Sequence, residues 1–160
     1  MIQIISGGQT GVDRAALDAA IELNIMYGGF CPKGRLAELG DIIPLKYALI
    51  ETSSSDYSER TKLNISNSDG MLIIVPCLPL PQKINDGTIL TMRYVLEANK
   101  PHLIVDISKA RSIDDIVAWV RRHSIKILNI GGSRESQCPG IYLLTFSFLK
   151  KVFSALNLKI

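Results

Sequence analysis

The chain has 160 residues, of which 47% are hydrophobic and 21% are charged, and its formal net charge is +3. This balance excludes an intrinsically disordered chain and is typical of a folded globular protein. The small positive charge, without a basic run or a patch of interleaved aromatic residues, argues against nucleic acid as a partner. We expect residues 1–160 to form a single domain with a substantial core.

Cysteine usage and hydropathy indicate the compartment. The three cysteines, Cys31, Cys77 and Cys138, contain no CxxC pair, which favours a reducing compartment and no disulfide framework. The most apolar stretch, residues 141–149, is too short to span a bilayer, and the N-terminus has no charged leader. We therefore expect a soluble, cytoplasmic protein that has no membrane partner.

The first predicted unit is a strand, a glycine-rich turn and a helix that follow one another without a gap. Residues 2–6 are an apolar run rich in β-branched side chains, the turn is Gly7-Gly8-Gln9-Thr10-Gly11, and the helix begins at Val12. Glycines let a ligand approach the backbone closely, and the unpaired amides of a helix N-terminus attract anions. The turn is therefore a candidate phosphate site, and we expect bulk at Gly8 to abolish binding there.

The same turn has a purely structural interpretation. It matches neither GxGxxG nor GxxxxGK[ST], and residues 10–13 fit a capping box in which Thr10 caps the helix. Asp13 and Arg14, in the first helical turn, suit either a role in positioning a ligand or a capping carboxylate and a surface ion pair. The turn alone does not decide between these alternatives.

The next segment carries two further candidate cations. Residues 26–31 are predicted as a strand, and the loop that follows contains Lys33 and Arg35 on either side of a glycine. These side chains could contact a phosphate or carboxylate, or simply be solvated. Residues 36–49 have an irregular pattern, and so long a loop in a compact domain is usually functional. Residues 47–51 are a candidate edge strand.

The remaining elements alternate regularly. Residues 53–56 offer caps for a helix over 57–66, and residues 71–75 form an apolar strand of the kind that is covered on both faces. A proline-rich loop over 77–86 leads to a helix that begins at Gly87-Thr88. A strand over 102–106, a helix from 112 to about 124 and a strand over 125–130 follow. The last strand runs into a second glycine turn, 131–136, and then a helix over 140–156 whose two apolar stripes indicate either a subunit interface or deeper burial.

Alternating strands and helices predict an α/β fold, a three-layer sandwich with a mostly parallel sheet of about five core strands and helices on both faces. Ligands of such sheets bind beyond the carboxyl ends of the strands, which brings the scattered motifs to one edge. The candidate ligand- and phosphate-binding residues are Gly7, Gly8, Gln9, Thr10, Gly11, Lys33, Arg35, Gly87, Thr88, Gly132, Ser133 and Arg134.

Other polar residues give weaker signals. His102 and His123 are far apart in sequence, so we predict no metal site. Asp106 ends a strand, where it could contact a ribose or pterin group or cap the following turn. No nucleophile stands beside a base, and we predict no catalytic residue.

Several blocks of the sequence together resemble one family. They are residues 4–18 and 31–38, Ser55-Asp56-Tyr57, Arg60-Thr61, Asn64, Ser68-Asp69-Gly70, Gly87-Thr88, Arg134-Glu135-Ser136 and Pro139-Gly140-Ile141-Tyr142. The family is that of the molybdenum-cofactor carriers, within the Rossmann-like superfamily that includes the lysine-decarboxylase-like, cytokinin-activating proteins. The resemblance implies a Rossmann-like ligand-binding domain, a homo-oligomer (dimer or tetramer), and a binding protein that carries molybdenum cofactor (molybdopterin), a pterin bearing a phosphate, without turnover.

On this resemblance the first glycine turn would hold the phosphate, with Lys33, Arg35, Thr88 and Arg134 around it. One departure is Asp86, which stands where the family tends to have a glycine and would repel an anion. The cytokinin-activating relatives cleave nucleoside monophosphates with glutamates that follow such a glycine motif. Here Gly87-Thr88 is followed by residues 89–92 without a carboxylate, which argues against an enzyme. The alternatives to a carrier are, in order, a sensor of a nucleotide-derived ligand and a nucleoside-monophosphate phosphoribohydrolase.

Overall fold

The computed structural model describes residues 1–84, 87–109 and 112–157. Its main sheet has five parallel strands in the order β2-β1-β7-β5-β6. The strands are β1 (Gln3–Ile5), β2 (Met26–Gly28), β5 (Gly70–Val75), β6 (His102–Asp106) and β7 (Ile127–Gly132). The expected α/β class and parallel sheet are confirmed.

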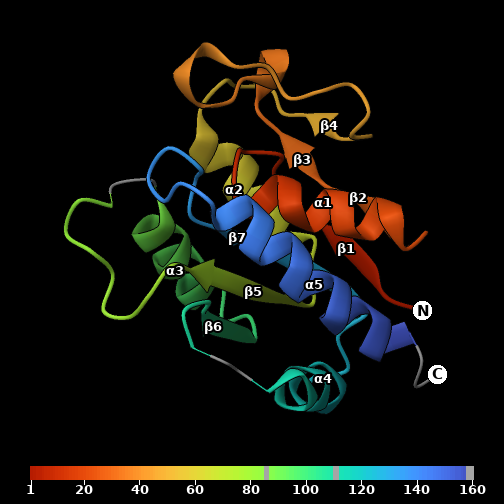
Figure 1. Cartoon of the computed structure of the whole chain (residues 1–160). Coiled ribbons are helices and arrows are strands. Elements are labelled where there is room, and N and C mark those ends of the chain that lie inside the picture. Colours follow the sequence, from red (N-terminus) through yellow and green to blue (C-terminus); the bar gives the residue numbers. More distant parts are fainter. Residues whose placement is uncertain (85–86, 110–111, 158–160) are drawn as a thin grey trace.

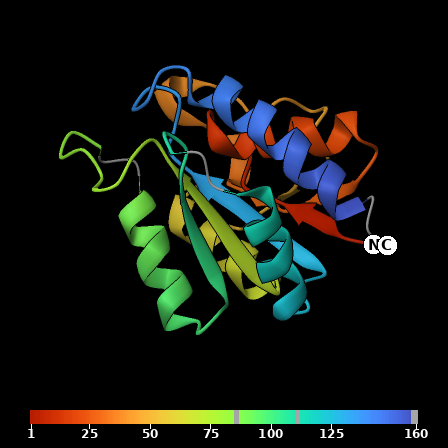
Figure 2. The ribbon, with the colours of Figure 1, turned by 60° about the horizontal axis from the view of Figure 1, so that its bottom comes forward.

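Helices cover both faces of this sheet, which makes three layers (Figures 1 and 2). One face carries α1 (Val12–Glu22), α4 (Ile113–Arg122) and α5 (Ile141–Asn157), and the other carries α2 (Tyr57–Ser66) and α3 (Thr88–Glu97). Strand β5 is buried along its whole length and alternates between the two cores: Leu72 and Ile74 pack under α1, α4 and α5, whereas Ile73 packs under α2 and α3. Burial on both faces explains its continuous apolar sequence.

The predicted strand over residues 26–31 is two strands in two different sheets. Gly29 separates them at a φ of +125°, and a Cβ there would lie 2.9 Å from the backbone nitrogen of Ser6. The chain therefore turns at Gly29, and β3 (Phe30–Cys31) pairs in parallel with β4 (Ile50–Glu51) in a small sheet of its own. The candidate strand over 47–51 is thus reduced to two residues that lie outside the main sheet.

The helix starts show one correct and one wrong capping prediction. Asp56 caps α2, because its Oδ1 accepts a hydrogen bond of 2.9 Å from the amide of Ser58. Thr10 does not cap α1: the N-cap is Gly11, and no side chain caps the helix. The Thr10 hydroxyl instead donates to Glu38, a residue of the long loop that the local pattern cannot include.

The order of the strands places the ligand-binding edge. Strand β7 enters last and lies between β1 and β5, where the winding direction of the sheet changes. The carboxyl ends of β1 and β7 therefore meet at this point, between α2 and α3, which is the usual position for a ligand in an open parallel sheet. Residues 32–55, with the β3–β4 sheet, lie beyond the same edge (Figure 1).

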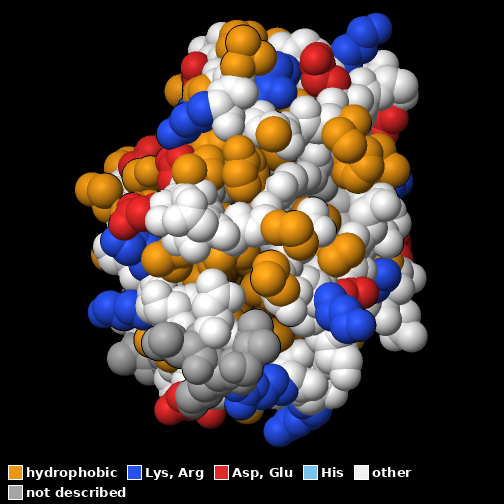
Figure 3. All heavy atoms as spheres, turned by 90° about the vertical axis from the view of Figure 1, so that its right-hand side faces the viewer, with side chains coloured by type: hydrophobic (Ala, Val, Ile, Leu, Met, Phe, Trp, Pro, Cys, Tyr) orange, Lys and Arg blue, Asp and Glu red, His pale blue; other side chains and the backbone are white. Residues whose placement is uncertain are grey.

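Large apolar side chains remain exposed on the last helix and the long loop. Helix α5 buries Leu149, Val152 and Phe153 but exposes Leu143 and Leu144, and the segment over residues 36–50 exposes Leu36, Leu39, Ile42, Leu45 and Ile50. Figure 3 shows apolar side chains spread over the upper and middle parts of the face on which β4 lies. Such a surface suits an interface, and the homo-oligomer remains a prediction. In the described part of the chain no helix has both the length and the apolar character that crossing a membrane requires.

Candidate functional site

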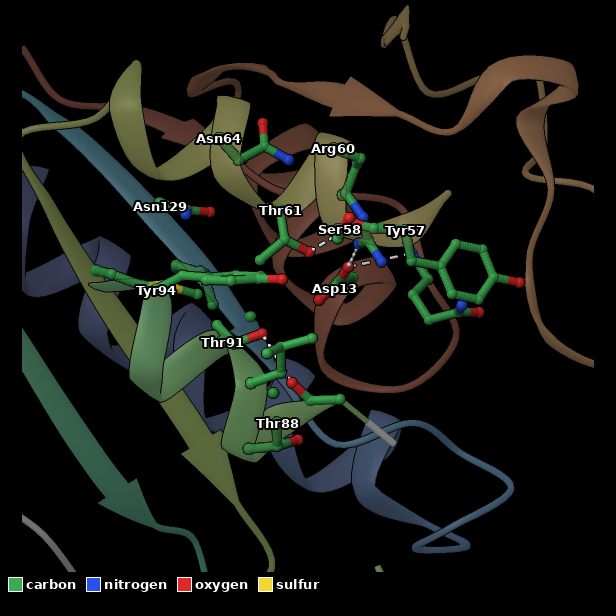
Figure 4. Close-up of a pocket in the computed structure, with 18 of the residues that line it drawn as sticks. Asp13, Tyr57, Ser58, Arg60, Thr61, Asn64, Thr88, Thr91, Tyr94 and Asn129 are labelled. Carbon is green, nitrogen blue, oxygen red and sulfur yellow. Dashed lines mark hydrogen bonds and ion pairs between the residues drawn. The ribbon is translucent and has the colours of Figure 1, made fainter. Parts of the chain in front are cut away.

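A polar cleft lies between α2 and α3 at the carboxyl ends of β1 and β7. The cleft is open to solvent, and together with its mouth it encloses about 630 Å³. It is lined by Gly7, Gln9, Asp13, Tyr57, Ser58, Arg60, Thr61, Asn64, Met71, Gly87, Thr88, Leu90, Thr91, Tyr94, Asn129, Ile130, Gly131, Gly132 and Arg134. Figure 4 shows the polar side chains of α2 and α3 on opposite sides of this space.

A buried ion pair stands at one end of the cleft. Nη1 of Arg60, from α2, lies 2.9 Å from Oδ2 of Asp13, from α1, and both side chains are at least nine-tenths buried. The amide of Gln9 also donates to Oδ2, at 3.2 Å. Burial raises the pKa of the Asp13 carboxyl, and the Arg60 guanidinium is the largest influence in the opposite direction. The pair therefore fixes Arg60 against the first glycine turn (Figure 4).

Two hydrogen-bond donors at this end have no acceptor among the described residues. Nε of Arg60 and Nε2 of Gln9 are both buried and unpaired. A buried donor without an acceptor costs about 1 to 3 kcal/mol, so such groups are rare unless a bound molecule or water satisfies them. Both residues line the cleft, and both present N–H groups of the kind that hold an anion.

A second guanidinium stands beside the first. The Cζ atoms of Arg60 and Arg134 lie 5.7 Å and 5.0 Å from the centroid of the Tyr57 ring. The charge of Arg134 also lowers the pKa of Asp13, although less than burial raises it. One aromatic ring thus holds two cations at the same end of the cleft, which makes this end positive.

Two helices begin at the cleft. Tyr57 and Ser58 are the first residues of α2, and Gly87 and Thr88 are the N-cap and first residue of α3. Helix N-termini favour negative charge. Together with the two guanidiniums, they make this region suitable for a phosphate or carboxylate.

The floor of the cleft is formed by β7. Asn129 and Gly131 lie on the face of this strand that α2 and α3 cover. Asn129 is 3% exposed and lines the cleft. Asn64 lines it too, and its amide pairs with the backbone of Phe30: it accepts from Phe30 N at 2.8 Å and donates to Phe30 O at 3.0 Å. Asn64 therefore holds β3 against α2.

The structure brings half of the sequence-predicted site residues to the cleft. The residues that line it are Gly7, Gln9, Gly87, Thr88, Gly132 and Arg134, and those that do not are Gly8, Thr10, Gly11, Lys33, Arg35 and Ser133. Asp86, the departure from the family pattern, lies outside the described residues.

Two amides of the first glycine turn, and that of the following Val12, donate to groups within the protein. Gln9 N donates to Asp13, Thr10 N to the Gln9 side chain at 3.1 Å, and Val12 N to Ser133 O at 3.2 Å. A Cβ on Gly8 would point away from the cleft, 2.8 Å from Leu49 Cδ1, at a φ of +77°. Bulk at Gly8 would therefore disturb packing and backbone, so it is no clean test of ligand binding.

Arg35, in the loop that follows β3, has a structural role. Arg35 donates from Nε to Ile43 O at 2.9 Å and from Nη2 to Pro44 O and Tyr47 O at 2.8 Å each. Three carbonyls fix this guanidinium within the long loop, and Lys33 lies exposed on the same short turn.

Thr10 and Ser136 meet on a buried carboxylate. The hydroxyls of Thr10 and Ser136 both donate to Glu38, and the amide of Ser136 donates to its Oε1 at 3.2 Å. Burial acts to raise the pKa of Glu38, but the hydrogen bonds from Ser136 and Thr10 outweigh it, so the pKa lies below its ordinary value. Glu38 thereby joins the first glycine turn, the long loop and the segment after β7.

The weaker candidates have structural roles in the described part of the chain. Asp106 accepts from Leu78 N and Ser108 N, each at 3.0 Å, and so holds the loops after β5 and β6. Among the residues described, no three His, Cys, Asp or Glu side chains are grouped as metal ligands.

Sequence reasoning missed most of the residues that α2, α3 and β7 contribute. Arg60 and Asn129 are the main cases. Arg60 stands among the residues that carry the family resemblance, but an arginine within a helix gives no local sign of a role in binding. Asn129 did carry one, because it interrupts an apolar strand, 127–130, that the fold covers on both faces.

Comparisons with known proteins agree with this architecture. The model of the Circularly permutated YpsA SLOG family matches residues 4–153. A crystal structure at 1.45 Å resolution, of a protein named "putative molybdenum carrier protein" from Syntrophus aciditrophicus SB, is 44% identical to this chain. The match covers 96% of this chain and 94% of that one, with a TM-score of 0.84. A comparison with curated proteins gives no match.

Proposed function

The chain belongs to the Circularly permutated YpsA SLOG family, and on that premise we propose that it is a binding protein for a small molecule that bears a phosphate. The observation that carries the proposal is the pair of buried, acceptor-free donors, Arg60 Nε and Gln9 Nε2, at the positive end of the cleft. A phosphate supplies several acceptor oxygens and the negative charge that two guanidiniums favour.

The phosphate subsite we propose combines residues predicted from the sequence with residues that only the fold brings in. Gly7, Gln9, Gly87, Thr88, Gly132 and Arg134 surround the phosphate in this proposal, and Arg60 joins them. Lys33 and Arg35 are left out because neither lines the cleft. Residues 1–160 act in this proposal as one ligand-binding domain.

The finer proposal concerns the cargo. The structural neighbour is named a putative molybdenum carrier, and we propose molybdenum cofactor, a phosphate-bearing pterin, as the ligand. The cleft supports this choice through its polar lining of hydroxyls and amides next to the anion-binding end. We further propose a homo-oligomer, supported by the exposed leucines of α5 and of residues 36–50. The cytoplasmic location that we propose is supported by the three cysteines without a CxxC pair.

The sensor and hydrolase alternatives use the same cleft. Among the described lining residues the one carboxylate is that of Asp13, and it is held by Arg60 and by the Gln9 amide. A general acid has to be free to exchange its proton with the substrate, so this arrangement supports binding more than cleavage.

The test is to purify the protein gently without oxygen from a cofactor-producing host and to identify the released small molecules by mass spectrometry. Molybdenum is counted in parallel by elemental analysis. The proposal expects a pterin phosphate, with or without metal. A nucleotide in its place would favour the sensor or the hydrolase, which incubation with nucleoside monophosphates then separates by the appearance of free base.

A further inference from the structure

The deep end of the cleft contains an amide group without a protein partner. Asn129 lies on the central strand β7 and is 3% exposed. Its side chain lines the cleft and forms no hydrogen bond to any residue that the structure describes. In Figure 4 it points from the strand into the cleft, on the side of Thr61 and Tyr94.

An amide at this position contradicts the pattern of the sheet. Its neighbours in register are Ile5 on β1 and Met71 on β5, both buried, and Leu128 and Ile130 on either side of it are core residues of the other face. The amide opens onto the cleft, so its hydrogen-bond partners come from water or from a bound molecule. The polar group therefore serves something that enters the cleft.

The groups around Asn129 determine which hydrogen-bonding pattern a ligand needs at this end of the cleft. The hydroxyls of Thr61 and Thr91 donate to the carbonyls of Tyr57 and Gly87, at 2.9 Å and 3.1 Å, so they offer mainly acceptor oxygens to the cleft. The Asn129 amide offers one acceptor and two donors. Tyr94 adds an aromatic ring to the same wall, with Lys62 Nζ 4.7 Å from its centroid.

The spacing links this end to the phosphate end. Gly131 follows Asn129 by two residues on the same face of β7, which separates them by about 6.5 Å along the strand. Gly131 and Gly132 stand at the edge where the guanidiniums gather. A ring joined to a phosphate by a short linker can thus extend from the positive edge to Asn129.

We propose that Asn129 is the specificity-determining residue of the cleft and that it reads the hydrogen-bonding edge of a planar heterocycle in which an N–H group adjoins a carbonyl. This inference rests on the proposed function, because it takes the phosphate end as the anchor. Both a pterin and a guanine base present such an edge, and they are the two possible sources of the ligand.

The test measures the affinities of three probes by calorimetry: 6-hydroxymethylpterin phosphate, GMP and ribose 5-phosphate, which has the phosphate but no heterocycle. Asn129→Leu removes the amide at nearly constant size, Asn129→Ala is a smaller variant in case leucine does not fit, and Asn157→Leu is the matched change at the exposed end of α5. The melting temperature of each ligand-free variant is recorded.

We expect the Asn129 variants to lose about tenfold in affinity for the preferred heterocyclic probe, the effect of removing a paired amide. Affinity for ribose 5-phosphate stays constant, Asn157→Leu changes nothing, and the melting temperature of Asn129→Leu does not fall. The affinities of the natural protein for the pterin probe and for GMP show which of the two heterocycles the cleft prefers. If both Asn129 variants still prefer the heterocyclic probe to ribose 5-phosphate as strongly as the natural protein does, the inference is overturned. The proposed function is not affected by that result. Failure of all three probes to bind the natural protein overturns both.

Discussion

The guanidinium of Arg60 occupies the space that a side chain on Gly7 would need. A Cβ on Gly7 would overlap Nη1 of Arg60 and lie 2.6 Å from its Cδ. Gly7 ends the segment after β1, whereas Arg60 comes from the middle of α2. The glycine is thus required here for space, and it lets a cation from a distant helix reach the carboxylate of Asp13 at the cleft.

Gly7→Ala should therefore displace Arg60 and separate it from Asp13. We expect the free energy of unfolding to fall by about 3 kcal/mol, since breaking a buried ion pair leaves a charge without its partner. Urea unfolding measures this loss. Gly28→Ala is the matched control, because a Cβ there would meet its nearest neighbour, Gln3 Nε2, at an ordinary 3.8 Å. Equal stability of the two variants would contradict the role given to Gly7.

Replacing Arg60 should make stability depend on pH. Burial raises the pKa of Asp13 in the folded protein, and Arg60 is the largest influence that opposes it. In Arg60→Met the folded-state pKa rises further above that of the unfolded chain. A group of this kind contributes stability below its unfolded pKa and loses it as the pH rises through its folded pKa.

The free energy of unfolding of Arg60→Met, relative to the natural protein, should therefore fall as the pH rises above the ordinary aspartate pKa of about 3.9. Urea unfolding at a series of pH values measures the difference. In the double variant Asp13→Asn/Arg60→Met the carboxyl is absent, so the pH dependence should disappear. A persistent dependence in the double variant would show that another group is responsible.

The stability that the Glu38 carboxyl contributes should depend on pH in the direction opposite to that of Asp13. The pKa of this carboxyl is lowered, because the hydrogen bonds from Ser136 and Thr10 outweigh the effect of burial. Such a group stabilises the fold above its unfolded pKa and loses the contribution as the pH falls through its folded pKa. Glu38→Gln should cost about 1 kcal/mol at neutral pH, and the difference should narrow below about pH 4.

Equilibrium unfolding of Glu38→Gln and of the natural protein, at neutral pH and below about pH 4, tests this expectation. Glu97→Gln, on the exposed last turn of α3, provides the same chemical change away from the glycine turns. A difference from the natural protein that stays constant with pH would contradict the role of the Glu38 carboxylate.

Gly131→Ala should narrow the cleft without unfolding the chain. The new methyl group would lie 3.0 Å from Met71 Cε, a flexible chain end, and 3.6 Å from Asp13 Oδ1. We expect a small change in melting temperature and a loss of about tenfold in affinity for ribose 5-phosphate, as the added atom takes ligand space. Gly28→Ala serves again as the control, and full affinity in Gly131→Ala would place the ligand elsewhere.

The sequence predicted the layers of the fold because hydrophobic periodicity is local. Residues 71–75 and 102–106 read as strands, and they are β5 and β6 within one residue at either end. The break at Gly29 was missed, since its cause is the close approach of Ser6, the residue that follows β1. The alternative in which Thr10 caps α1 is wrong for a similar reason, since its partner, Glu38, is brought in by the tertiary fold.

The candidate site could be predicted only where it lies on loops that leave strands. Gly7, Gly87 and Arg134 belong to such loops and line the cleft. Arg35 also follows a strand, but three carbonyls of its own loop bind it. Arg60 belongs to the blocks that resemble the family, but its role in the cleft could not be predicted, because that role depends on its packing against Gly7 in the folded chain.

The central claim is that a phosphate-bearing ligand is held at the edge of the cleft between α2 and α3. Amide chemical shifts of the isotope-labelled protein, followed by NMR while ribose 5-phosphate is added, test this claim most directly. The account predicts that the largest shifts occur at Gly7, Thr88 and Gly132. Shifts confined to the loop around Lys33 and Gly34, with the cleft amides unchanged, would contradict it.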